Sequence, residues 1–160
     1  TIWDIGAGCG SIGLEALKLR PNLKLFSIDK RFGSKVLISE NARRLGVRPI
    51  DIFEDDINNL FNLNNIYSLQ KVQRVIIGGC NINTKVRIIS YFSKCMNPGD
   101  IISVPLIDIE AIKNLREIFT ENNFSVNLNL IQTYKSLSIS EGLRLDPNNP
   151  VFLLKGIKIT

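Results

Sequence analysis

The sequence contains no histidine, and this absence excludes several catalytic chemistries at once. Without an imidazole the chain cannot build a Ser-His-Asp triad, a Cys-His pair or a metal site with histidine ligands. It also lacks the side chain that most often acts as a general base near neutral pH. Any catalysis by this protein must therefore use other means.

Cysteine is scarce, and long apolar runs are missing. Cys9, Cys80 and Cys95 are odd in number and form no C-x-x-C pair, so the sequence favours neither a disulfide framework nor a metal site. No apolar run approaches the roughly 20 residues that a membrane span needs, and no basic, apolar leader is present. We therefore expect a protein of the reducing cytoplasm without a membrane partner.

The chain has the length and composition of one globular domain. Its 160 residues are 44% hydrophobic, enough for a single core, and we expect one domain over residues 1–160. The 20 basic and 15 acidic residues leave a net charge of +5. This excess favours an anionic partner such as RNA, a membrane surface or a metabolite with several carboxylates.

Strand-like and helix-like segments alternate along most of the chain. This alternation predicts an α/β fold whose parallel sheet is covered by helices on both faces. The predicted helices lie at residues 11–19, 32–46, 84–96 and 108–123. The predicted parallel strands lie at residues 1–6, 23–29, 49–55, 72–79 and 101–107.

The C-terminal part breaks the alternation. Residues 124–134 and 150–159 are rich in strand-forming residues, and no helical segment separates them. We expect these two runs to pair antiparallel at one edge, which completes a seven-stranded, mostly parallel sheet. The connection at 135–149 is longer than most, so we expect a functional or mobile loop there.

Several glycines follow the first predicted strand, in the sequence "DIGAGCGSIG". A loop that turns sharply, lets a ligand touch its backbone and opens a helix needs residues without a Cβ, as at Gly6, Gly8 and Gly10. The amides that begin the next helix would offer a partial positive charge to an anionic group. The alternative interpretation is a tight turn with close helix packing.

Acidic residues accompany these glycines at three strand ends. A carboxylate at Asp4 is costly unless it meets donors or a cation, and the ammonium of an amino-acid ligand would satisfy it. This favours S-adenosylmethionine over NAD, whose pyrophosphate an acid would repel. Asp29 could accept both ribose hydroxyls, and Asp55 and Asp56 could reach the adenine edge. Each acid alone could instead be a solvated residue at a strand end.

These motifs resemble a known family. "WDIGAGCGSIGLEA", "FSIDK", "EDDINNL" and "VIIGGC" together are similar to class I S-adenosylmethionine-dependent methyltransferases, which have a Rossmann-like fold. "LNLIQTYKS" and "GLRLDPNNPVFLL" narrow the resemblance to the decarboxylating C(15)-methyltransferases of cobalamin biosynthesis, which act on precorrin-6Y or cobalt-precorrin-6B. The resemblance covers nearly the whole chain. It implies S-adenosyl-L-methionine as cofactor and a tetrapyrrole (corrin) as substrate.

The resemblance also implies roles for individual residues. It places Asp29 at the cofactor ribose, and it places Gly78 and Gly79 beside the substrate. Among the basic residues, Arg144, Lys135 and Lys85 could meet the corrin carboxylates, and no residue is assigned a catalytic role. The residues expected to bind the cofactor are Asp4, Gly6, Ala7, Gly8, Cys9, Gly10, Asp29, Asp55 and Asp56.

The chain departs from the family at three places. Cys80-Asn81-Ile82 stands where relatives have more glycine, and Val104-Pro105 ends the fifth strand where relatives carry a polar residue. Relatives also have a helix and a Thr-Lys segment before the first strand. We therefore expect a fragment of a larger polypeptide that works with a C5-methylase domain or subunit, and we expect a homo-oligomer.

Two other functions are compatible with the sequence. The same cofactor module serves tRNA and rRNA methyltransferases, and the positive charge permits an RNA substrate. Methylases that act on base nitrogens often carry Asn/Asp-Pro-Pro-aromatic after the fourth strand, whereas this chain has "GGCNIN". The third interpretation is a non-catalytic subunit that binds S-adenosylmethionine.

Overall fold

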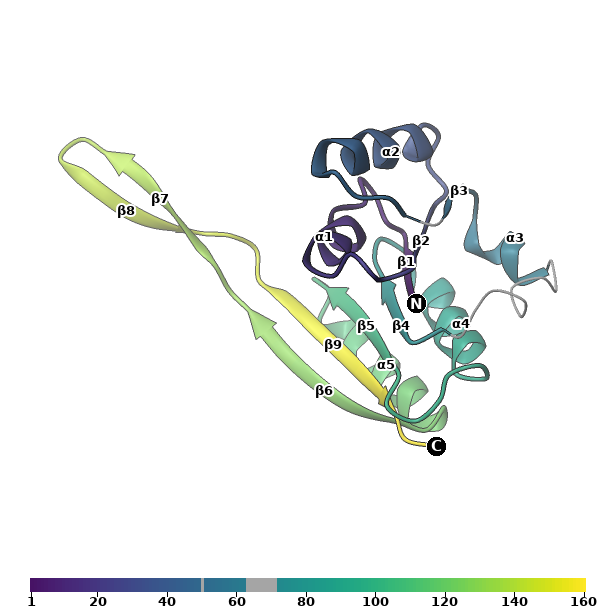
Figure 1. Cartoon of the computed structure of the whole chain (residues 1–160). Coiled ribbons are helices and arrows are strands. Elements are labelled where there is room, and N and C mark those ends of the chain that lie inside the picture. Colours follow the sequence, from purple (N-terminus) through teal and green to yellow (C-terminus); the bar gives the residue numbers. More distant parts are fainter. Residues whose placement is uncertain (50, 63–71) are drawn as a thin grey trace.

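A computed structural model describes residues 1–49, 51–62 and 72–160, and in it helices and strands alternate up to β6 (Figure 1). The helices are α1 (Ser11–Leu19), α2 (Ser34–Leu45), α3 (Ile57–Asn62), α4 (Ile82–Phe92) and α5 (Glu110–Glu121). The strands are β1 (Ile2–Ile5), β2 (Leu25–Asp29), β3 (Asp51–Glu54), β4 (Arg74–Ile77), β5 (Ile101–Leu106), β6 (Phe124–Ile131), β7 (Tyr134–Ile139), β8 (Gly142–Pro147) and β9 (Val151–Lys158).

Seven of the strands form one sheet in the order β3-β2-β1-β4-β5-β9-β6. Strands β1 to β5 are parallel, whereas β9 runs antiparallel to both β5 and β6. The chain builds outward from β1 to β3 and then returns to place β4 on the other side of β1. Ligands of open α/β sheets bind at such a reversal, outside the carboxyl ends of the strands.

The core lies on both faces of the sheet because the parallel strands alternate their side chains between two helical layers. On one face Leu14, Leu17 and Ile38 of α1 and α2 pack against Ile2 and Leu25. The other face holds the larger cluster, which α3, α4 and α5 cover. Its members include Trp3, Phe26, Phe92, Leu115 and Phe119. Among the described residues, no helix is long and apolar enough to cross a membrane.

The predicted seven-stranded sheet and its antiparallel edge are confirmed. The prediction of a loop at 135–149 is wrong, because most of this segment forms the antiparallel hairpin β7–β8, an arm that projects from the body (Figure 1). Ser140 and Glu141 make its two-residue turn, directly before Gly142. Short turns of this kind with a neighbouring glycine are a hairpin signal.

Two glycine-containing loops touch through their backbones at the reversal point. The Gly78 amide donates to the Ile5 carbonyl at 2.7 Å. A Cβ at Gly78 would lie 2.7 Å from the Gly6 carbonyl oxygen, and a Cβ at Gly6 would lie 2.9 Å from the Gly79 nitrogen. The loops after β1 and β4 can therefore approach this closely only without side chains at Gly6 and Gly78.

This contact predicts unequal effects of alanine at two neighbouring positions. Gly78→Ala should lower the free energy of unfolding by roughly 1–3 kcal/mol, the range for overpacking a rigid site. Gly79→Ala should change it by less than about 0.5 kcal/mol, because a Cβ there meets nothing within 4 Å. Urea unfolding of both variants measures the difference. Equal losses at the two positions would contradict the proposed backbone contact.

Candidate cofactor site

A cleft of about 380 Å³ opens at the carboxyl ends of β1, β2 and β4. Its lining includes Gly6 and Gly8 from the loop after β1, Asp29 at the end of β2, and Gly79 after β4. Asp55 and Asp56, which follow β3, and Ile57 close another side. The sheet topology thus brings residues far apart in sequence to one cleft of the size typical for small ligands.

The loop after β1 turns into α1 through three glycines. Gly6, Gly8 and Gly10 have φ of 69°, 66° and 81°, a region that disfavours side chains. Of the predicted loop residues, Gly6 and Gly8 line the cleft, whereas Ala7, Cys9 and Gly10 are outside its lining. Ala7 packs against the smaller core cluster, and a Cβ at Gly10 would meet Ile38. Cys9 is exposed.

Asp29 is the most densely hydrogen-bonded side chain of the cleft. Its Oδ2 accepts from the Gly8 amide at 2.7 Å and from Arg31 Nη2 at 3.3 Å. Its Oδ1 accepts from the Arg31 amide and from Arg31 Nε, both at 2.9 Å. Partial burial alone would raise the pKa of Asp29, but the hydrogen bonds from Arg31 and Gly8 outweigh it and lower that pKa. Asp29 is therefore ionised at neutral pH.

Arg31 is a cleft residue that the sequence analysis did not single out. It lies over the glycine loop, since a Cβ at Gly8 would come within 3.1 Å of its Nη2. The guanidinium is mostly exposed and forms an ion pair with Asp29 at 2.9 Å. The one sequence signal for this ion pair is the position of Arg31 two residues after Asp29, the acid expected to bind the ribose.

Asp4 lies beneath the glycine loop rather than on the wall of the cleft. It is 2% exposed, and its Oδ2 accepts from the Gly13 amide at 3.1 Å. Burial raises the pKa of Asp4 to about 6, although the Gly13 hydrogen bond opposes this shift. The carboxylate thus has an internal partner at the start of α1, and its contact with a ligand ammonium stays a prediction.

The two acids after β3 line the cleft while they also organise the start of α3. Asp55 Oδ1 accepts from the Asp56 amide and from Asn59 Nδ2, both at 2.7 Å. Asp56 Oδ1 accepts from the amide and the side chain of Asn58, at 2.9 and 2.8 Å. Its Oδ2 lies 3.8 Å from Lys30 Nζ. This turn stands where the adenine-binding turn is expected.

The segment after β4 closes one side of the cleft. The sequence analysis assigned a ligand-binding role only to Gly78 and Gly79 of this segment. Gly79 lines the cleft and faces open space, whereas Gly78 serves the contact between the two loops. Cys80, Asn81 and Thr84 also line it. Asn81 caps α4 by accepting from the Thr84 amide at 2.8 Å, so the departure from glycine supplies a helix start.

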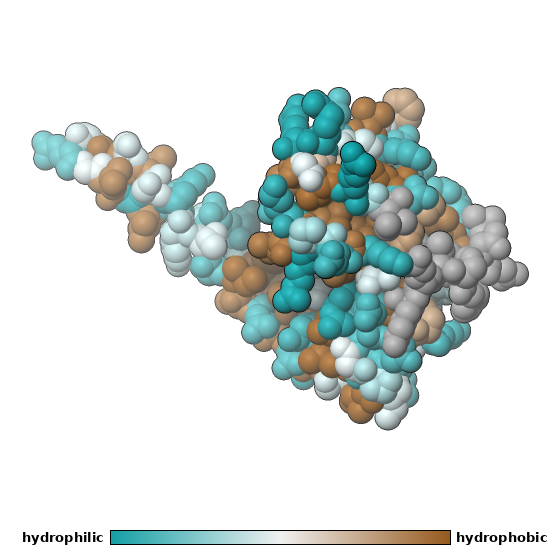
Figure 2. Space-filling view, in the orientation of Figure 1, coloured by the Kyte–Doolittle hydropathy of each residue, from teal (hydrophilic) through white to brown (hydrophobic). Residues whose placement is uncertain are grey.

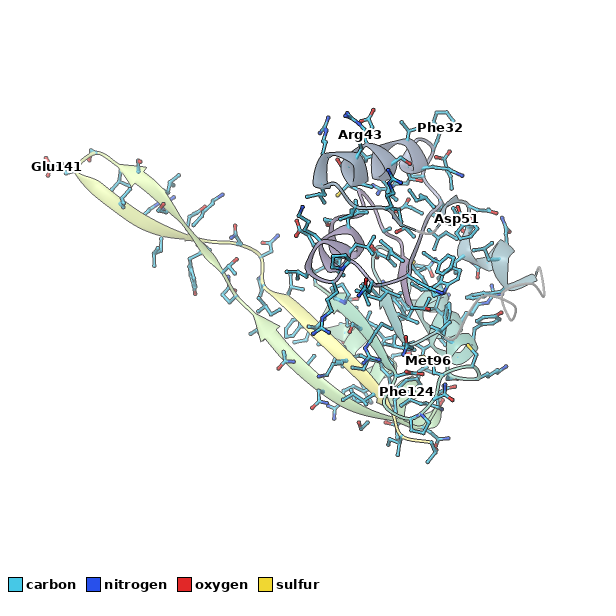
Figure 3. All side chains as sticks on the ribbon, viewed as in Figure 1. Phe32, Arg43, Asp51, Met96, Phe124 and Glu141 are labelled. Atoms are coloured by element: carbon cyan, nitrogen blue, oxygen red, sulfur yellow. The ribbon has the colours of Figure 1, made fainter. Side chains whose placement is uncertain are left out.

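Lys85 is buried and donates from Nζ to the Cys80 carbonyl, and burial lowers its pKa. None of the three expected cations is part of the lining of the cleft. Lys135 and Arg144 lie on the β7–β8 arm, where their side chains pair with Asp146 at 3.5 and 3.7 Å. Figure 3 shows how far Glu141, at the tip of the same arm, lies from the body of the chain. A substrate contact of Arg144 therefore stays a prediction.

A family model described as the precorrin methyltransferase domain matches residues 1–158. The chain belongs to this family. This precorrin methyltransferase domain is similar to the probable cobalt-precorrin-6B C(15)-methyltransferase (decarboxylating) of Sulfolobus acidocaldarius. The two sequences are 23% identical over 156 residues, and the alignment covers 97% of this chain and 78% of that protein. The corresponding protein of Salmonella typhimurium is 27% identical, with 94% and 75% covered.

The fold is also similar to the folds of solved structures. The precorrin-6y C5,15-methyltransferase of Geobacter metallireducens superposes with a TM-score of 0.82 at 22% identity, covering 98% of this chain and 80% of that one. The predicted resemblance to corrin-ring methyltransferases and the Rossmann-like fold are therefore confirmed. Within the described part of the chain, no group of acidic or cysteine side chains could hold a metal ion.

The buried Asp4 predicts an unusual pH dependence of stability. Because its pKa is about 6 in the folded state and 3.8 in the reference state, the folded protein binds the proton more tightly. Asp4 therefore lowers the free energy of unfolding as the pH rises from about 4 to above 6, by at most roughly 3 kcal/mol for two pKa units.

Asp4→Asn should remove this loss, because the amide is neutral and its oxygen can still accept from Gly13. The variant should be more stable than the parent at pH 7.5 and no more stable at pH 4. Urea unfolding of both proteins at the two pH values measures this, since the difference between them isolates Asp4. A stability difference that does not change with pH would contradict the raised pKa.

Proposed function

We propose that this precorrin methyltransferase domain binds S-adenosylmethionine in the cleft and methylates a precorrin or cobalt-precorrin at ring carbon 15. The names of its relatives describe a decarboxylating reaction, and the family resemblance implies that the carboxylate lost as carbon dioxide is that of the acetate at ring carbon 12. The observation that carries the proposal is the ionised Asp29 at the end of β2, which lines a cleft at the sheet reversal together with Gly79.

The residues present fit this cofactor. S-adenosylmethionine supplies a methyl group on a positively charged sulfur, together with a ribose whose two hydroxyls need acceptors. Asp29 would accept them, the Gly6 and Gly8 loop would lie along the methionine and ribose side, and the Asp55-Asp56 turn would border the adenine. The two cations that line the cleft, Lys30 and Arg31, are each paired with one of its acids, Asp56 and Asp29 respectively.

The number of hydrogen bonds that Asp29 already accepts indicates how the site would rearrange when a ribose binds. A carboxylate offers about four acceptor positions, and here two backbone amides and two guanidinium nitrogens occupy them. The backbone amides belong to Gly8 and Arg31 and hold the loops. A ribose diol at Asp29 would therefore replace the Arg31 side chain and leave these two amides in place.

The substrate side of the cleft would be formed by the segment after β4. Gly79 leaves space for a flat ring to approach. Methyl transfer to a nucleophilic ring carbon depends on in-line placement more than on a side-chain base, so a chain without histidine can perform it. No residue of the cleft is assigned a proton-transfer role.

The assembly of the protein is part of the same proposal. A homo-oligomer, and cooperation with a C5-methylase domain or subunit, are consistent with the family but rest on no contact within this chain.

An RNA substrate is the competing function that the net charge of +5 favours. RNA binding would be salt-sensitive because it depends on phosphate contacts and counterion release.

Substitution of Arg31 tests the cofactor site. Arg31→Ala should lower the dissociation constant for S-adenosylhomocysteine, because the guanidinium no longer competes for Asp29. Asp29→Ala should weaken binding by roughly 1–3 kcal/mol, the cost of losing a hydrogen-bonded carboxylate. Calorimetric titration measures both. Lys30→Ala is the matched control, since Lys30 is a neighbouring cation that approaches Asp56 instead.

Three results would count against this site. Unchanged affinity in Asp29→Ala with a normal circular dichroism spectrum would show that Asp29 does not touch the ligand. Weaker binding in Arg31→Ala would mean that Arg31 helps to hold the cofactor rather than competing with it. Equal gains in Lys30→Ala and Arg31→Ala would reduce the effect to general electrostatics.

A methylation assay tests the substrate. The protein should transfer labelled methyl to a corrin intermediate, detected by mass spectrometry together with the loss of carbon dioxide. Gly79→Leu should abolish transfer and leave cofactor binding nearly unchanged, because the side chain fills substrate space, whereas Gly79→Ala should remain active. Label in RNA with none in the corrin, falling steeply as salt is added, would contradict the proposal and favour the RNA methylase.

A further inference from the structure

A buried lysine lies next to a residue that lines the cleft. Figure 2 shows hydrophilic residues over the surface of the body, whereas Lys85, in the first turn of α4, is only 8% exposed. Lysine is almost never fully buried unless its amino group is paired. Lys158, which is equally buried, places its amino group over the ring of Phe124, but Lys85 has no aromatic neighbour of this kind among the described residues.

No carboxylate compensates the amino group of Lys85. Within the described ranges of the chain, its Nζ has one hydrogen-bond partner, the Cys80 carbonyl, and it forms no ion pair. Residues 50 and 63–71, which lie outside those ranges, include no aspartate or glutamate. A buried cation without a carboxylate partner is costly, so stability does not explain why a lysine occupies this position.

The hydrogen bond from Lys85 completes the fixation of the loop after β4. At one end of this loop the Gly78 amide donates to a carbonyl of β1 at 2.7 Å. At the other end the side chain of Asn81 caps α4. Between these ends the Cys80 amide donates to the Gly78 carbonyl at 2.7 Å, and the Cys80 carbonyl accepts from Lys85.

Gly79 is the residue of the loop whose path depends on this hydrogen bond. A Cβ at Gly79 would meet nothing within 4 Å, so no packing restricts this residue. Glycine also has the greatest conformational freedom of all residues. Lys85 fixes the chain directly after Gly79 because it holds the carbonyl of Cys80. Gly79 and Cys80 both line the cleft, on the side that the proposed function gives to the corrin ring.

We propose that Lys85 is a positioning residue for methyl transfer, which holds the Cys80 carbonyl and thereby fixes the wall of the cleft against which the corrin ring is placed. This inference rests on the proposed function, because it names the residue that shapes the substrate side of that cleft. It differs from a direct contact with a corrin carboxylate, since the Lys85 amino group donates to the loop and Lys85 is outside the lining.

Amide hydrogen exchange of the protein alone tests the positioning. Lys85→Met keeps a long apolar side chain and removes the donor, so the amides of residues 79–81 should exchange at least about tenfold faster, as expected when a local restraint is lost. The matched control is Arg87→Met, which removes an exposed cation two residues further along α4 and should leave this exchange unchanged.

Steady-state methylation of a corrin intermediate distinguishes positioning from carboxylate binding. Lys85→Met should lower kcat by roughly 10- to 100-fold, the effect expected when reacting groups are slightly misplaced. The KM for the corrin should change by less than about threefold, because a contact with a corrin carboxylate would instead raise KM and leave kcat unchanged. The Kd for S-adenosylhomocysteine should stay within about twofold, since Asp29 and its partners are untouched.

Thermal unfolding separates this role from a merely structural one. Replacement of a buried charge by an apolar side chain of similar volume is often neutral or stabilising, so Lys85→Met should lower the midpoint by no more than about 3 °C. Lys85→Gln is the second variant if methionine impairs folding. Its side chain is one bond shorter and ends in a polar group, and it should show the same faster exchange and lower kcat.

Several outcomes would overturn this inference and leave the proposed function intact. They are unchanged exchange and kcat in the folded Lys85 variants, a raised KM at unchanged kcat, a larger fall of the thermal midpoint in both variants, and equal losses in Arg87→Met. A parent protein that transfers no methyl group to a corrin would overturn the proposed function and this inference together.

Discussion

The contact between two peptide backbones at the centre of the sheet sets the geometry of this protein. Gly6 and Gly78 let the loops after β1 and β4 approach until a Cβ at Gly78 would lie 2.7 Å from the Gly6 carbonyl oxygen. This closeness brings the glycine loop, the end of β2 and the segment after β4 around one cleft. The reversal of strand order at β1 and β4 makes the contact possible, because it places these two strands side by side.

Asp29 links this geometry to chemistry. It accepts the Gly8 amide, so the same carboxylate that would bind a ribose also holds the glycine loop in place. Asp4 also lies near the carboxyl end of a strand, but it has a different role. It is buried, and its carboxylate accepts a hydrogen bond from the Gly13 amide in the first turn of α1. One acid therefore faces the cleft in an ionised form, and the other supports the loop from beneath with a pKa that burial raises to about 6.

Much of this could be predicted from the sequence because the signals are local. The alternation of strands and helices, the glycine loop, and the acids at the end of β2 and after β3 follow from periodicity and turn chemistry. The acids already favoured S-adenosylmethionine as the cofactor, and the family resemblance added the corrin substrate. The arm was missed because β7 and β8 bury nothing within the chain, so their alternation of serine with leucine and charged residues marks no core. The packing role of Gly78 depends on a contact with the distant loop at Gly6 and has no local signature. Arg31 is only two residues from Asp29, but a two-residue spacing on a loop does not by itself indicate an ion pair.

The central claim is that Asp29 receives the ribose of a sulfonium cofactor at the expense of Arg31. A crystal structure of the protein with S-adenosylhomocysteine tests this most directly. The account predicts both ribose hydroxyls within hydrogen-bonding distance of the Asp29 carboxylate, the Gly8 amide still donating to it, and the Arg31 side chain displaced. A ligand bound in the cleft whose ribose lies away from Asp29, with the Arg31 ion pair intact, would contradict it.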